Sequence, residues 1–76
     1  MARPNLGRTY AGLTDDPQQR AREHGMPRDW QQRVFTTEKE ARAWEKDKLA
    51  HGCVGGPGGA GWRWGYTYTI TTETKE

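Results

Sequence analysis

Cysteine and long apolar runs are scarce in this sequence. Its 76 residues include one cysteine, Cys53, so an intrachain disulfide is excluded and we expect no disulfide-linked partner. Hydrophobic residues make up 32% of the chain, the mean hydropathy is -1.17, and no apolar run approaches the ~20 residues of a transmembrane helix. The first residues carry no signal-peptide pattern. We therefore expect a soluble, cytoplasmic protein without a membrane partner.

Charge of one sign is also scarce. Twelve basic residues face ten acidic ones, and the excess lies before residue 36, where six arginines and no lysine face four acidic residues. The forked guanidinium group of arginine suits phosphate oxygens. The candidate nucleic-acid contacts are Arg8, Arg22, Arg28 and Arg33. Scattered surface arginines that only keep the protein in solution remain the alternative.

The chain is rich in aromatic residues for its length. A domain of 76 residues buries only about 60% of the surface that its unfolded chain exposes, so it depends on a few large side chains. Four Trp, three Tyr and one Phe supply them. We expect a single domain over residues 1–76, with an N-terminal arm over 1–7 and a flexible, glycine-rich connector over 52–61.

The first half of the chain predicts a strand over residues 8–14 and then a helix. Asp16 can cap the helix, Pro17 is tolerated at its first position, and Gly25 supplies a left-handed stop after about His24. This helix is nearly devoid of apolar residues. Burial is therefore a poor explanation for its sequence.

The middle of the chain predicts a strand over residues 30–35 and a second helix to about His51. Thr37 and Glu40 have the spacing of a capping box. The core-facing stripe of this helix comprises Ala41, Trp44, Lys48 and Leu49. Glu45 falls inside the stripe, where a carboxylate is costly unless it is paired, metal-bound or near the rim. Pairing with Arg42 or Lys48 is the simpler alternative.

The last strand is the most regular element of the sequence. Over residues 62–70, one predicted face carries Trp62, Trp64, Tyr66, Tyr68 and Ile70. A helix between the first two strands implies that they run parallel, and the most apolar strand gains most from the central place. The pattern predicts an α+β domain in the order β-α-β-α-β. We expect two helices flanking a small three-stranded sheet whose C-terminal strand is central and antiparallel to both neighbours.

Two segments resemble the GIY-YIG nuclease family. Residues 10–24 contain Tyr-Ala-Gly, a polar turn, and a helix with Arg20 and Glu23-His24, similar to the second half of that motif. Residues 34–46 resemble the family's next strand and the helix that ends in a metal-binding glutamate. The family's first motif strand does not precede Tyr10, but residues 66–70 resemble it. The resemblance therefore implies a circular permutation, which is tolerated where termini lie close together.

This resemblance implies a metal-dependent DNA endonuclease. It assigns Tyr10, Tyr68, Arg20 and His24 as catalytic residues, Glu45 as the metal ligand and Gly12 as the motif glycine. In such a site Mg²⁺ or Mn²⁺ on the glutamate neutralises phosphate charge, the arginine clamps nonbridging oxygens, and a tyrosine with a lowered pKa activates water.

Two other functions remain open from the sequence. One is a noncatalytic nucleic-acid-binding module that uses the arginines. The other is a small protein-interaction domain that uses an edge strand or an exposed tryptophan. Strand tyrosines are also common core residues, and Arg20 could simply pair with Asp16 on the helix surface.

Overall fold

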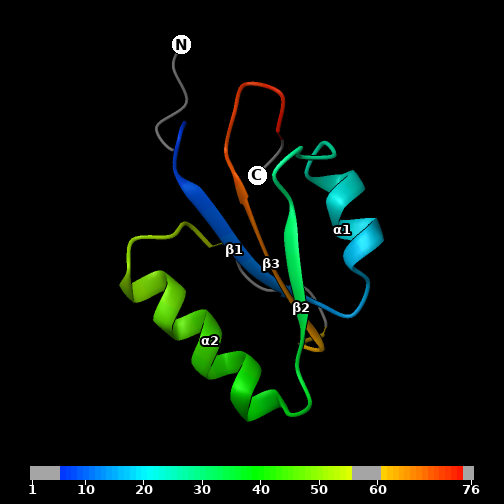
Figure 1. Ribbon diagram of the computed structural model, residues 1–76, viewed down its shortest axis with the longest axis vertical. Coiled ribbons are helices and arrows are strands. Elements are labelled where there is room, and N and C mark those ends of the chain that lie inside the picture. Colours follow the sequence, from blue (N-terminus) through cyan, green and yellow to red (C-terminus); the bar gives the residue numbers. More distant parts are fainter. Residues whose placement is uncertain (1–5, 56–60, 75–76) are drawn as a thin grey trace.

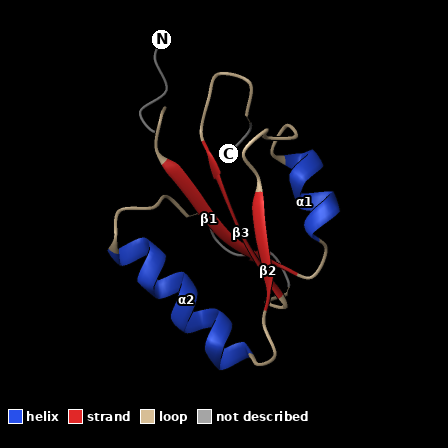
Figure 2. Ribbon diagram, in the orientation of Figure 1, coloured by secondary structure: helices blue, strands red, loops and turns tan. Residues whose placement is uncertain are grey.

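The computed structural model describes residues 6–55 and 61–74, and it confirms the predicted architecture (Figure 1). A three-stranded sheet in the order β1-β3-β2 places the C-terminal strand in the centre, antiparallel to both neighbours. Two helices flank it (Figure 2). The elements are β1 (Thr9–Thr14), α1 (Pro17–Glu23), β2 (Gln31–Val34), α2 (Glu38–Ala50) and β3 (Trp64–Thr69).

Helix α1 begins and ends at the predicted residues. The Asp16 carboxylate accepts the Gln19 backbone N–H at 3.0 Å, and Pro17 occupies the first helical turn. Gly25 has a φ of 85° and stops the helix after His24. None of the seven residues of α1, all of them described, is buried. This helix is therefore held at its ends rather than by an apolar face.

Helix α2 is capped by Thr37, whose hydroxyl accepts the Glu40 backbone N–H at 3.2 Å. The capping box is only half formed, because the Glu40 carboxylate accepts the Thr36 hydroxyl at 3.1 Å instead. The expected stripe is partly wrong. Ala41 is fully buried, but Leu49, in the last turn of the helix, is 45% exposed.

The two faces of the sheet carry separate apolar clusters. One contains the buried residues Tyr10, Tyr66, Tyr68 and Ile70, with Trp30 and Val54 against them. The other contains Leu13, Phe35 and Ala41, with Trp44 and Trp62. The prediction that Trp62 shares the tyrosine face is wrong, because β3 begins at Trp64 and the alternation does not extend back to Trp62.

The edges of the sheet differ from each other. Val54, which the sequence placed in a flexible connector, forms a parallel bridge with Tyr10 along the outer side of β1. The Ala11 N–H donates to the Val54 carbonyl and the Val54 N–H donates to the Thr9 carbonyl, each at 2.8 Å. This part of the connector therefore belongs to the sheet. Residues 56–60 of the connector and 1–5 of the arm lie outside the described residues. The four residues of β2, on the other edge, are all exposed.

None of the described helices is long and apolar enough to cross a membrane.

Candidate active site

The two tyrosines that the sequence singled out lie side by side on adjacent strands. Tyr10 on β1 is directly opposite Tyr68 on β3. Their rings are nearly parallel, with centroids 5.2 Å apart. Both belong to the buried cluster on the α1 side of the sheet. The antiparallel pairing of the last strand with the first therefore unites residues that are far apart in the sequence.

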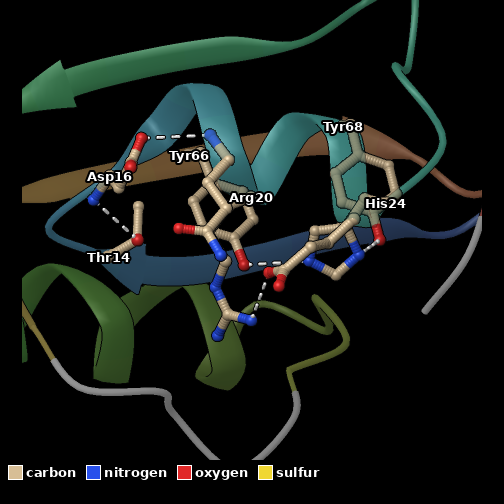
Figure 3. Close-up of polar contacts among 8 residues, drawn as sticks. Thr14, Asp16, Arg20, His24, Tyr66 and Tyr68 are labelled. Atoms are coloured by element: carbon tan, nitrogen blue, oxygen red, sulfur yellow. Dashed lines mark hydrogen bonds and ion pairs between the residues drawn. The ribbon is translucent and has the colours of Figure 1, made fainter.

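His24 lies among these aromatic rings and uses both of its nitrogens (Figure 3). Its Nδ1 is hydrogen-bonded to the Tyr68 hydroxyl at 2.8 Å and its Nε2 to the Tyr66 hydroxyl at 3.1 Å. A neutral imidazole donates from one nitrogen and accepts at the other, so one phenol accepts and the other donates. His24 is only 5% exposed, and the Tyr10 ring lies 4.9 Å from it. The three side chains form one buried, hydrogen-bonded chain, Tyr66–His24–Tyr68.

Tyr66 is the residue that sequence reasoning missed. It shares a face with Tyr68, and its ring lies over Gly12, where a Cβ would be 2.5 Å from the tyrosine oxygen. This close approach explains why glycine is needed at position 12. The regular alternation along β3, read together with Gly12 on its partner strand, could have revealed it.

The ionisation of Tyr66 differs from what an activating tyrosine requires. Burial raises the pKa of Tyr66 to about 12; the neighbouring Tyr10 and the charges of Glu23 and Glu45 add to the rise, and Arg20 opposes it. Tyr66 is therefore a neutral phenol at physiological pH. The groups that influence this pKa come from three elements, β1, α1 and α2.

Arg20 extends from α1 across β1 (Figure 3). Its guanidinium pairs with Glu23 at 3.1 Å, so pairing with Asp16 was the wrong alternative. Partial burial lowers the pKa of Arg20, but the hydrogen bond to Glu23 and the neighbouring Tyr66 and Tyr10 together raise it by more. The pKa of Arg20 is therefore above its ordinary value. The side chain remains 26% exposed and can meet an anion from solvent.

Glu45 on α2 is the candidate metal ligand. It is 22% exposed and lies 3.6 Å from Arg42, so the simple ion pair expected from its spacing is present. No group of three or more His, Cys, Asp or Glu side chains within residues 6–55 and 61–74 could hold a metal. A single partly accessible carboxylate fits Mg²⁺ or Mn²⁺ shared with a substrate phosphate, because Mg²⁺ commonly uses one or two carboxylates plus phosphate oxygens and water.

The predicted nucleic-acid arginines do not gather on one surface. The Arg8 guanidinium donates to the Gly52 carbonyl at 2.7 Å, at the end of α2. Arg33 lies over the Phe35 ring, 4.8 Å from its centroid, on the α2 side of the sheet. Arg22 lies on α1, and Arg28 lines a hollow at the end of β3. The predicted arginines therefore form no single basic patch, and Arg20 is the arginine whose charge acts on the tyrosine cluster.

Comparison with known proteins adds no relative. No protein-family model, curated protein or solved structure matches this chain.

Proposed function

We propose that this protein is a circularly permuted GIY-YIG-like nuclease that hydrolyses phosphodiester bonds in DNA. The observation that supports the proposal is that three groups from three elements, the Tyr10 phenol and the charges of Arg20 and Glu45, all act on the ionisation of Tyr66, while Tyr10 lies opposite Tyr68 in the sheet. The central position of β3 is the position that the permutation requires. The Gly7 backbone N–H donates to Ile70 at 2.8 Å, so the chain enters and leaves the sheet at the same end, as a permuted order demands.

The exposed and buried residues of the site have different roles. Arg20 binds the nonbridging oxygens of the scissile phosphate, because its guanidinium is accessible and stays charged. Tyr10, at 9% exposed, is more accessible than Tyr66 and Tyr68, which supports assigning it to the attacking water. His24 and Tyr68 are 5% and 1% exposed, so they position the Tyr10 ring rather than touch substrate.

Glu45 supplies the carboxylate for a divalent cation. Mg²⁺ or Mn²⁺ bound there would neutralise phosphate charge and stabilise the leaving oxygen. The contact between Glu45 and Arg42 is long, at 3.6 Å, and lies near the surface. Such an exposed pair is weak enough for a cation to replace it.

A nicking assay on branched and linear DNA with Mg²⁺ or Mn²⁺ tests the proposal. Arg20→Ala and Glu45→Ala should each reduce cleavage by about 100-fold or more, the usual effect of removing one transition-state charge contact. Arg63→Ala and Glu38→Ala, which remove the same charges from exposed positions, should leave cleavage unchanged. Absence of cleavage, or equal cleavage by Arg20→Ala and wild type, contradicts the proposal.

A noncatalytic nucleic-acid-binding module is the second candidate. It is favoured by the raised pKa of Tyr66 and by the occupation of both His24 nitrogens, which leave these groups poorly suited to proton transfer. Binding should then weaken steeply with salt and survive Glu45→Ala, without any cleavage.

A further inference from the structure

A hollow of about 530 Å³ lies between α1 and β2. Figure 1 shows α1 standing beside this edge of the sheet. Four residues of the helix line the hollow: Pro17, Gln18, Ala21 and Arg22. Trp30 and Gln32 form the strand side.

Trp30 gives the hollow a fixed aromatic surface. One face of the indole stacks on Tyr66, with centroids 4.4 Å apart and planes 13° apart. The indole Nε1–H donates to the Gln32 side chain at 2.9 Å, which holds the ring in its plane. Trp30 is half-buried and lines the hollow, so its second face is the one available to a planar ligand.

Met26 lines the hollow and has a backbone conformation that is unfavourable for a residue with a side chain. Its φ is 55°, the only positive value among the described non-glycine residues, and its side chain is 65% exposed. Its backbone N–H donates to the Ala21 carbonyl at 2.8 Å, which closes the end of α1. Glycine would adopt this positive φ without strain. A strained backbone that presents a flexible apolar side chain to solvent is typical of a ligand-binding position.

The polar groups at the rim point to the nature of the ligand. Gln18 and Gln32 bring planar amide groups that can donate to and accept from a base edge. Arg22 brings positive charge suited to a phosphate. An extended peptide paired with β2 would use the strand backbone and would need neither the indole face nor the arginine.

We propose that this hollow binds an unpaired nucleobase of single-stranded DNA, stacked on the second face of Trp30 with Met26 over it. The choice of DNA rests on the proposed function, since Trp30, which lines the hollow, stacks on Tyr66 of the candidate site. The proposal assigns the substrate class: DNA with an unpaired strand next to the scissile phosphate.

Two oligonucleotides of equal charge test the base contact. Fluorescence anisotropy in EDTA compares a short oligothymidylate with an abasic oligonucleotide of the same length. The oligothymidylate should bind about 5- to 150-fold more tightly, the ratio that one stacked base supplies. Equal affinity overturns the proposal. Tighter binding of the oligouridylate of the same length overturns the assignment to DNA. The assignment to a nucleobase is overturned if a peptide displaces the oligothymidylate and the peptide, but not the oligothymidylate, shifts the Trp30 indole resonance.

Two variants separate binding from folding. Trp30→Leu should reduce the ratio of the two affinities to near one. Because that variant also removes the stack on Tyr66, Met26→Gly provides the sharper test. It relieves the positive φ and should leave the protein at least as stable in urea, yet it should reduce the ratio by several-fold. An unchanged ratio in Met26→Gly contradicts the proposed contact.

The outcome can be distinguished from that of the nuclease proposal. Glu45→Ala should keep the preference for the oligothymidylate over the abasic strand, because Glu45 lies on the other helix. Preference without cleavage by wild type would reject the nuclease and retain the base site. Cleavage by wild type without a preference for the oligothymidylate would retain the nuclease and reject the base site.

Discussion

Raising the pH above 10 should destabilise this protein through one buried phenol. Burial raises the pKa of Tyr66 from 10.0 to about 12, with the neighbouring Tyr10 adding to the rise. The unfolded chain therefore loses this proton before the folded chain does, and the stability that the neutral phenol contributes is lost as the pH rises through the folded pKa. A difference of about two pKa units corresponds to about 2.7 kcal/mol in full, of which about 1.4 kcal/mol is lost by about pH 11.

Urea denaturation of wild type and Tyr66→Phe, followed by tryptophan fluorescence, measures this contribution. At neutral pH the variant should be less stable by about 1–3 kcal/mol, because His24 Nε2 loses its partner at 3.1 Å inside the core. Between about pH 8 and about pH 11 the gap between the two proteins should narrow by about 1.4 kcal/mol. All other titrating groups are common to both proteins. A gap that stays constant over this range refutes the reasoning.

Three further predictions concern stability. Gly12→Ala should lower the free energy of unfolding in urea by about 1–3 kcal/mol, because its Cβ would lie 2.5 Å from a buried phenol oxygen. Gly55→Ala should cost less, because its Cβ would meet the end of the exposed Leu49 side chain at 2.8 Å and the Ala11 carbonyl only at 3.3 Å; equal costs would contradict the packing argument. The hydrogen bonds from Thr69 hold the pKa of Asp29 below 3.8. Wild type should therefore lose stability relative to Asp29→Asn as the pH falls from about 5 through that pKa. A difference between the two melting temperatures that stays constant over this pH range would refute the prediction. Thr37→Ala should lower the free energy of unfolding by about 1 kcal/mol by removing the cap of α2, and a melt unchanged from wild type would show that the cap contributes nothing.

Much of the local structure could be predicted because its causes are local. Asp16 and Thr37 cap the helices through backbone groups three residues away, and Gly25 and Gly52 take the positive φ values that end them. These interactions depend on sequence spacing alone. The limits of a pattern are harder to predict, as Trp62 shows: alternation continues in the sequence beyond the point where the backbone leaves the sheet.

The candidate site was only partly predictable. Tyr10, Arg20 and Glu45 were identified by resemblance to a family, and that relationship stays a prediction. The partner of Arg20 was not evident, since Glu23 and Asp16 lie at similar distances along the helix. The burial of His24 between two phenols depends on where β3 passes, which no spacing within α1 reports.

The sequence by itself determined the kind and order of the elements, because caps, glycine stops and side-chain alternation act over a few residues. Only the tertiary structure decided that Tyr66 lies over Gly12 and that His24 joins Tyr66 to Tyr68. The physical reason is that these contacts join residues more than 40 positions apart, and their formation depends on the register between β1 and β3 and on the space left by a single missing Cβ.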